Sequence, residues 1–131
     1  MNRLIGHTEN VAEELCGLLL GRLLDEETGE VSDFVRVSNS ETKDRQHFYL
    51  ISTDDYLRAE RIALESNLEI LGVYHTHLNY PPIPSETDKR FAFPGFFYLI
   101  LSMIDYKYLH ARCWRMTEMA VFMEEEIRFY S

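Results

Sequence analysis

The spacing of apolar residues along the chain predicts a domain rich in β-strands. Strict alternation of apolar and polar residues is typical of a half-buried strand, whereas a short unbroken apolar run is typical of a fully buried one. By these criteria the expected strands are residues 15–24, 31–37, 47–52, 69–77, 95–104, 109–116 and 119–130. The first two would form a hairpin across the turn 25–30. Gly17 and Gly21 mark points where a backbone must approach closely.

Three segments carry helix signals. Thr8 is followed by acidic residues and predicts a capped helix over residues 9–15. Thr53 is expected to cap a longer helix over 53–67, and Ser85 to open a short one over 85–93. The longer helix would place an apolar set on or near one face, namely Tyr56, Leu57, Ala59, Ile62 and Ala63. This pattern predicts a single α+β domain over residues 1–131, with a mixed, strongly curved sheet flanked by helices.

Composition narrows the classes of function. The chain has 131 residues, a net charge of −9 and a pI near 4.9. A protein that tracks nucleic-acid phosphates normally presents a basic face, so we expect no nucleic-acid partner, while the acidity leaves room for a basic protein partner. Cys16 and Cys113 are far apart in sequence and surrounded by apolar residues, which favours two reduced thiols in the core of a cytosolic protein.

The N-terminus and the longest apolar run bear on localisation. Residues 1–14 lack the apolar core of a signal peptide. The apolar run 91–104 is broken by Pro94 and Gly95, and it falls short of the roughly 20 residues that a membrane-spanning helix needs. We therefore expect a soluble, cytoplasmic protein with no membrane partner.

The stretch GVYHTHLNYPPIPSETDKR, residues 72–90, carries the candidate chemistry. His75 and His77 stand two positions apart in an expected strand, so their side chains should point to one face and could share a zinc ion at about 2.0–2.1 Å. After a proline-rich loop, Asp88 begins a helix and could bring a carboxylate to the same ion. Two histidines and one carboxylate leave the fourth tetrahedral position open, as catalytic zinc requires.

Each part of this pattern also has a purely structural interpretation. Two histidines at alternate strand positions are more often ordinary histidines than metal ligands. The sequence SETD is a helix start in its own right, with Ser85 as N-cap and Asp88 three residues later, much like a capping box. Glu14, at an expected helix-to-strand junction, would by itself be one more acidic residue on a helix. Taken singly, each structural interpretation is favoured; taken together, the residues favour a metal site.

With Glu14 included, the chain specifically resembles the JAMM (also called JAB or MPN+) zinc metalloproteases. That family's pattern is a glutamate before a GLLLG-like strand, then H-[ST]-H-P-x5-P-S-x-x-D. Here Glu14 precedes Gly17 by three residues, and the second part reads His75-Thr76-His77-Leu78, five residues, then Pro84-Ser85-Glu86-Thr87-Asp88. The similarity covers nearly the whole chain, including SETDKRFAFPGFFYLILS, and is greatest to the small prokaryotic members. Leu78 replaces the usual proline, which puts the rigidity of the loop in question, not the metal.

The resemblance implies a JAB/MPN fold, which is a cytidine-deaminase-like architecture, and a role for each matching residue. His75, His77 and Asp88 would bind one zinc ion together with a water molecule. Glu14 would be the general acid/base, taking a proton from the attacking water and passing it to the leaving amine. Ser85 would donate a hydrogen bond to the oxyanion of the tetrahedral intermediate.

The resemblance also implies a substrate class. Family members cleave peptide or isopeptide bonds just after the Gly-Gly tail of ubiquitin or a ubiquitin-like protein, with the tail extended beside a sheet edge. The chain is too short for the large insertions of the eukaryotic deubiquitinases. It resembles compact bacterial and archaeal members, whose partners include sulfur carrier proteins that end in Gly-Gly. The expected function is therefore a zinc metallopeptidase that releases cysteine or a C-terminal extension from such a carrier.

Three alternatives remain at this point. The first is a deconjugase that removes a ubiquitin-like modifier from lysines of target proteins. The second is a non-catalytic MPN scaffold, which the intact set of polar residues argues against. The third is a metal-binding domain outside this family, and the match at Glu14 argues against it.

Overall fold

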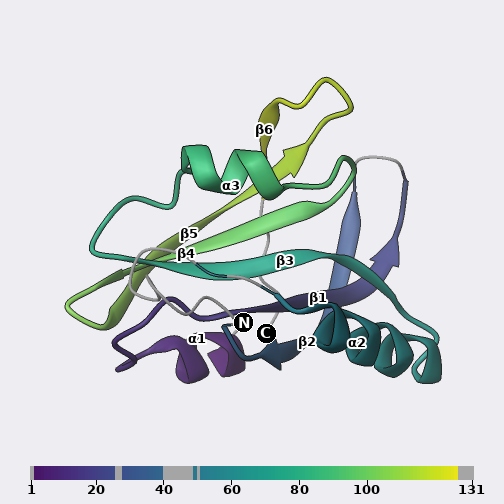
Figure 1. The fold of residues 1–131 in the computed structure, drawn as a ribbon, viewed down its shortest axis with the longest axis horizontal. Coiled ribbons are helices and arrows are strands. Elements are labelled where there is room, and N and C mark those ends of the chain that lie inside the picture. Colours follow the sequence, from purple (N-terminus) through teal and green to yellow (C-terminus); the bar gives the residue numbers. More distant parts are fainter. Residues whose placement is uncertain (1, 26–27, 40–48, 50, 127–131) are drawn as a thin grey trace.

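Six strands form one mixed sheet in the order β2-β1-β3-β4-β5-β6 (Figure 1). The computed structural model describes residues 2–25, 28–39, 49 and 51–126. Neighbouring strands are antiparallel except β3 and β4, which are parallel. The strands are β1 Cys16–Leu23, β2 Gly29–Val37, β3 Glu69–Leu78, β4 Phe97–Ile104, β5 Lys107–Met116 and β6 Phe122–Glu125. The predicted hairpin of the first two strands is confirmed.

The sheet buries apolar side chains on both faces, and helices cover each. On one face Leu4 of α1 (Asn2–Thr8) belongs to a cluster with Leu19, Tyr74 and Leu101. On the other face the buried alanines of α2 (Thr53–Glu65) pack with alternate residues of β1 and β3; this cluster includes Ala59, Ala63, Leu18 and Val73. The third helix, α3 (Glu86–Phe91), connects β3 to β4. The predicted α+β class, with a mixed sheet and flanking helices, is confirmed.

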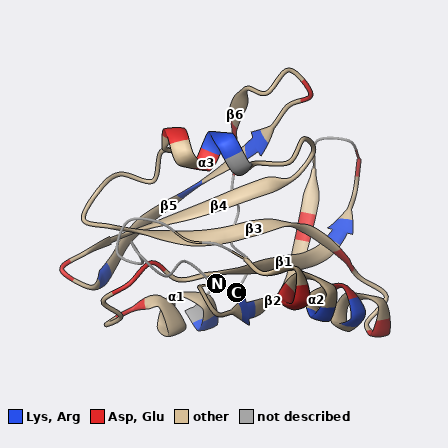
Figure 2. Ribbon diagram, viewed as in Figure 1, with Lys and Arg blue, Asp and Glu red and all other residues tan. Residues whose placement is uncertain are grey.

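The centre of the sheet is almost free of Asp, Glu, Lys and Arg. Glu69 is the only such residue in β3, and β4 has none, while the charged residues lie mainly on helices, turns and outer strands (Figure 2). Two glycines allow close strand contacts. A Cβ atom at Gly21 would overlap the carbonyl oxygen of Glu30, and one at Gly72 would overlap that of Phe97. The expected close approach at Gly21 is thus confirmed, and at Gly17 the neighbour is the Tyr74 ring.

The prediction of a helix over residues 9–15 is wrong, because the N-terminal helix ends at Thr8 instead of beginning after it. The Thr8 hydroxyl donates to the carbonyl of Ile5 at 2.8 Å, and Asn10 takes a left-handed conformation with φ of 64°. These features are typical of a helix end. The apolar side chain of Leu4, 4% exposed, supplies the tertiary contact that a seven-residue helix needs.

The longer helix begins where expected, but its cap is Ser52, not Thr53. The Ser52 hydroxyl accepts a hydrogen bond from the Asp55 amide at 3.1 Å. Leu57 is 51% exposed and does not belong to the buried face. Of the strand expected over 47–52, the described residues Tyr49, Ile51 and Ser52 are not in a strand, and the others lie outside the described residues.

The C-terminal segment is only partly strand, since β6 covers Phe122–Glu125 and residues 127–131 lie outside the described residues. Both cysteines are free thiols, Cys16 being buried and Cys113 partly buried. Burial raises the pKa of each thiol to about 12, so both stay protonated at neutral pH. Among the described helices, none has the length and apolar character needed to span a membrane.

Candidate metal centre

Two histidines of β3 lie side by side beneath the surface. Alternation along the strand sends His75 and His77 to one face and Tyr74 and Thr76 to the other. Both imidazoles have no exposed surface, and their Nε2 atoms are 3.1 Å apart. The structure therefore places the two histidines as the sequence predicted, with their Nε2 atoms meeting at one point.

The first turn of α3 brings Asp88 to the same point. Its Oδ1 is 3.3 Å from Nε2 of His75, and its Oδ2 is 3.2 Å from Nε2 of His77. Ser85 forms a capping box with Asp88, in which the Ser85 amide donates to Oδ2 at 2.8 Å and the Ser85 hydroxyl accepts from the Asp88 amide at 3.0 Å. The capping box and the candidate ligand are thus not competing interpretations, because the cap orients the carboxylate.

A carbonyl group on the far side of His77 fixes its tautomer. Nδ1 of His77 lies 2.8 Å from the carbonyl oxygen of Pro81. A carbonyl can only accept, so Nδ1 carries a proton, and in the neutral tautomer with that proton the lone pair belongs to Nε2, the nitrogen that faces Asp88 and His75. This is the usual arrangement of a metal-binding histidine. For His75 the structure gives Nδ1 no hydrogen-bond partner within the described part of the chain.

Burial and local contacts shift the pKa values of His75 and Asp88. Burial lowers the pKa of His75, which favours the neutral imidazole. For Asp88, burial would raise the pKa, but the contacts with His75 and His77 and the hydrogen bond from the Ser85 amide outweigh it, and the pKa lies well below its usual range. An ionised Asp88 carboxylate beside a neutral His75 imidazole is a combination that suits a cation.

The separations also fit a small tetrahedral ion. Ligand atoms bound at about 2.0–2.1 Å in a tetrahedron lie roughly 3.3 Å from one another. The two Nε2 atoms of His75 and His77 are 3.1 Å apart, and each lies 3.2–3.3 Å from a different carboxylate oxygen of Asp88. A carboxylate oxygen of Glu14 also lies within 4.8 Å of both imidazoles. His75, His77 and Asp88 could thus hold a metal ion directly, with Glu14 beside it.

Glu14 reaches the site from a segment that is not helical, contrary to the expected junction. It lies two residues before β1 and is 1% exposed. Its carbonyl accepts from the Asn39 side chain at 3.1 Å, and the next amide, that of Leu15, donates to the Thr76 hydroxyl at 2.9 Å. One carboxylate oxygen accepts from the Tyr80 hydroxyl at 2.9 Å. A carboxylate on a solvated helix face would instead be exposed to water.

The loop after β3 is fastened to β4 and β5 by side chains that the sequence did not single out. The Ser102 hydroxyl donates to the carbonyl of Tyr80 at 2.8 Å, and the Trp114 indole donates to that of Pro82 at 3.0 Å. The loop therefore has anchors even though Leu78 replaces the usual proline. Leu78 itself is the last residue of β3 and packs against the apolar cluster on the opposite face.

Two further aromatic rings at the site went unnoticed in the sequence. Tyr80 stacks on His77 with ring centroids 3.9 Å apart, and Tyr49 stacks on His75 at 4.4 Å. Tyr80 could have been suspected, because it is the aromatic residue inside the loop between the candidate ligands. No sequence signal marks Tyr49, which stands 26 residues before His75.

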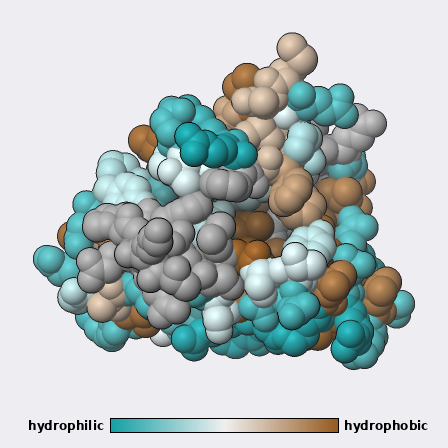
Figure 3. Space-filling model, in the orientation of Figure 1, coloured by the Kyte–Doolittle hydropathy of each residue, from teal (hydrophilic) through white to brown (hydrophobic). Residues whose placement is uncertain are grey.

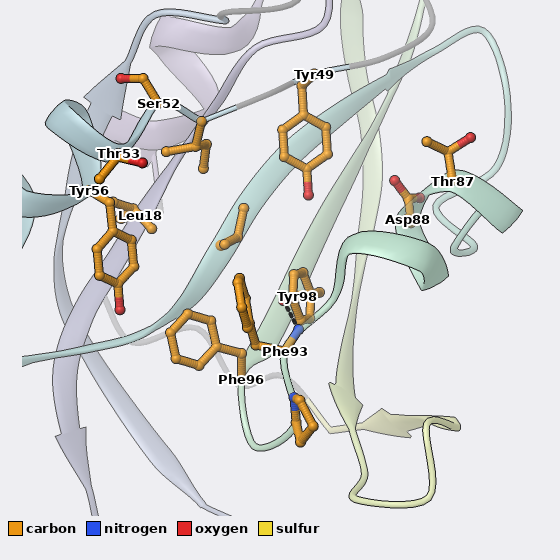
Figure 4. A pocket seen from close by; sticks show the side chains of 13 residues that line it. Leu18, Tyr49, Ser52, Thr53, Tyr56, Thr87, Asp88, Phe93, Phe96 and Tyr98 are labelled. Carbon is orange, nitrogen blue, oxygen red and sulfur yellow. Dashed lines mark hydrogen bonds between the residues drawn. The ribbon is translucent and has the colours of Figure 1, made fainter.

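A pocket of about 710 Å³ opens beside Asp88 on the same face of the sheet. In Figure 3 apolar side chains form the floor of a hollow near the middle of the view. Asp88 lies at one end of the pocket and Tyr56 at the other (Figure 4). The rings that line it include Tyr49, Phe93, Phe96 and Tyr98. The polar site therefore adjoins a large apolar surface.

Comparison with known proteins places the chain in a family. Residues 3–117 match the model of the prokaryotic homologues of the JAB domain. The chain is 33% identical over 90 residues to a desampylase of Haloferax volcanii, which is 68% of this chain and 62% of that protein. It is 31% identical over 75 residues to a desampylase of Pyrococcus furiosus, covering 57% of this chain and 49% of that protein. The matches thus span less than two thirds of either curated relative.

Two solved structures share the fold. A protein of Desulfitobacterium hafniense aligns with a TM-score of 0.79 and 28% identity, covering 98% of this chain and 86% of the other. A protein of Salinibacter ruber aligns with a TM-score of 0.71 and 30% identity, covering 97% and 88%. Together with the sequence match over most of its length, these likenesses show that the chain belongs to the family of prokaryotic JAB-domain homologues.

Proposed function

We propose that this protein is a zinc-dependent metallopeptidase that hydrolyses the amide bond after the Gly-Gly tail of a ubiquitin-like or sulfur carrier protein. The observation that carries the proposal is the convergence of His75, His77 and Asp88 within 3.1–3.3 Å, with the buried Glu14 carboxylate beside them. A scaffold that only binds proteins would have no need for three buried lone-pair groups facing one another.

Each residue then has a distinct part in the reaction. His75, His77 and Asp88 would hold zinc, which when bound lowers the pKa of a water molecule towards about 7 and polarises the scissile carbonyl. Glu14 takes a proton from the attacking water as the water oxygen bonds to the carbonyl carbon. Glu14 then gives that proton to the nitrogen as the C–N bond breaks.

Ser85 stabilises charge on the carbonyl oxygen. Its hydroxyl accepts one hydrogen bond from the Asp88 amide, but it still carries its own proton, which can be donated to a developing oxyanion. Its half-buried position at the start of α3, beside the carboxylate of Asp88, supports this role.

The pocket beside Asp88 offers a place for the apolar part of the substrate tail. Its aromatic rings would bury such side chains while the small Gly-Gly end lies at the metal centre. A flexible tail that becomes ordered here would gain contacts along its length before the bond is cut.

Two leaving groups remain candidates. The first is cysteine or a short C-terminal extension, as expected from the size of the chain. The second is a lysine of a target protein, and the name desampylase, carried by both curated relatives, favours this one. The chemistry at Glu14 is the same in both, since each reaction ends with protonation of an amine.

A paired cleavage assay tests the proposal. Zinc-loaded protein is mixed with a Gly-Gly carrier that ends in cysteine or a short extension, with the same carrier linked to lysine, and with lysine-linked ubiquitin chains. We expect a free Gly-Gly carrier from at least one of the first two, poor cleavage of the ubiquitin chains, and loss of cleavage after chelation that added zinc reverses. Cleavage that survives complete removal of metal, or no cleavage of any substrate by the loaded protein, would contradict it.

A further inference from the structure

One tyrosine connects the proposed general acid/base to the proposed metal ligands. Tyr80 stacks its ring on His77, with centroids 3.9 Å apart and planes 13° from parallel. Its hydroxyl donates to Oε2 of Glu14 at 2.9 Å. The two contacts come from opposite parts of one rigid side chain. Tyr80 therefore fixes the carboxylate of Glu14 relative to the imidazole of His77.

Hydrogen bonds to the backbone of Tyr80 and its neighbours hold Tyr80 in place. Its carbonyl accepts from the Ser102 hydroxyl at 2.8 Å, and the next carbonyl, of Pro81, accepts from Nδ1 of His77. Just before it, Asn79 adopts a φ of 65° and its amide donates to the carbonyl of Met103 at 2.6 Å. The ring is thus placed by β3 and β4 and needs no substrate to order it.

We infer that Tyr80 is a positioning residue that holds the Glu14 carboxylate in the orientation needed for proton transfer; the inference rests on the proposed function. A glutamate side chain has three rotatable bonds, and a proton-transferring group must stay within hydrogen-bond reach of its partner. The O–H of Tyr80 restricts Oε2, so that Glu14 keeps one conformation. Without that bond the carboxylate would visit other rotamers, and only a fraction of molecules would be ready to react.

The variant Tyr80→Phe isolates the hydroxyl, because phenylalanine keeps the ring on His77. We expect zinc content and melting temperature close to those of the wild type, a KM within about threefold, and a kcat lowered on the order of 10- to 100-fold, the scale of one hydrogen bond to a charged group. Tyr106→Phe is the matched control, since Tyr106 lies in the turn between β4 and β5 and is 48% exposed. It should leave kcat unchanged.

A double-mutant cycle shows whether Tyr80 acts through Glu14. If it does, adding Tyr80→Phe to Glu14→Gln should slow the reaction little further, because the carboxylate that Tyr80 orients is already gone. Independent, multiplicative losses would overturn the inference, as would a Tyr80→Phe enzyme with wild-type kcat. A Tyr80→Phe protein that loses its zinc would also overturn it, because Tyr80 would then act on the metal site.

A structural measurement decides the matter even if no substrate is cleaved. High-resolution crystal structures of the zinc-loaded wild type and of Tyr80→Phe should show one Glu14 conformer in the first and two or more in the second. A single, unchanged Glu14 conformer in Tyr80→Phe would overturn the inference. An inactive wild type with these expected conformers would instead count against the proposed function alone.

Discussion

Most polar side chains at the candidate metal centre are oriented by a hydrogen bond to a residue outside the proposed ligand set. The carbonyl of Pro81 holds His77, the amide of Ser85 holds Asp88, and the hydroxyl of Tyr80 holds Glu14. His75 is covered by the Tyr49 ring instead. Such outer contacts fix the direction of a ligand before the metal arrives, and their loss typically weakens metal affinity.

The first residue-scale prediction concerns the metal. Purified protein should contain one zinc per chain, and His77→Ala or Asp88→Ala should lower that content sharply, because each change removes one of three side chains whose polar atoms converge at 3.1–3.3 Å. Elemental analysis of fresh and zinc-reconstituted protein measures this. His110→Ala, at an exposed histidine of β5, is the control and should keep its zinc. Full zinc in either site variant would exclude that residue as a ligand.

At the scale of elements, α3 links helix capping to the chemistry of the site. Its capping box at Ser85 satisfies backbone amides of the first turn, and the same bonds aim Asp88 at the histidines. The loop before α3 is fastened by Ser102 of β4 and Trp114 of β5. The position of the Asp88 carboxylate therefore depends on contacts from β4 and β5 as well as on α3 itself, and it is set before any ligand binds.

Ser85→Ala should reveal both roles of that residue. Loss of the cap should cost about 1 kcal/mol, which corresponds to a few degrees in melting temperature for a domain of this size. Loss of the oxyanion donor should lower kcat by about 10²- to 10³-fold. Ser85→Thr keeps a hydroxyl for both roles and should stay closer to the wild type. A Ser85→Ala enzyme with normal kcat would remove Ser85 from the mechanism, whatever its stability.

The elements also show what the sequence could and could not predict. The strands β1 to β5 were predictable because apolar runs and alternation mark them, and α3 because Ser85 and Asp88 form a capping box. The N-terminal helix was misplaced because Thr8 resembles an N-cap, whereas its hydroxyl bonds back to Ile5. The packing of Leu4 against the sheet favours the observed arrangement, and such a contact is not visible in a local pattern.

Some features of the candidate site could likewise be predicted from the sequence, and others could not. His75, His77 and Asp88 could be predicted because strand alternation and the helix cap fix where their side chains point. The burial of Glu14 and the contacts of Tyr80 could not, because they join residues 66 positions apart. Spacing along the chain carries no information on such a pair, which meets only once β1 and β3 are side by side.

At the scale of the whole molecule, two features bear on the partner. The chain has a net charge of −9, and in the part that the structure describes the charged residues lie mainly on helices, turns and outer strands, while the central strands that bear the candidate site are almost uncharged (Figure 2). An acidic surface would favour encounter with a basic partner, and its contribution should weaken with added salt. The apolar pocket beside Asp88 would then supply the contacts that hold the tail in place.

The most direct test of this account measures zinc content and cleavage rate on one preparation of Glu14→Gln. Glutamine keeps the size of the side chain, and its amide oxygen can still accept from Tyr80, but it cannot take up the proton. We predict a folded protein with full zinc whose turnover falls on the order of 10²-fold or more. Full zinc with a near-normal rate would contradict the account, because Glu14 would then have no part in the chemistry.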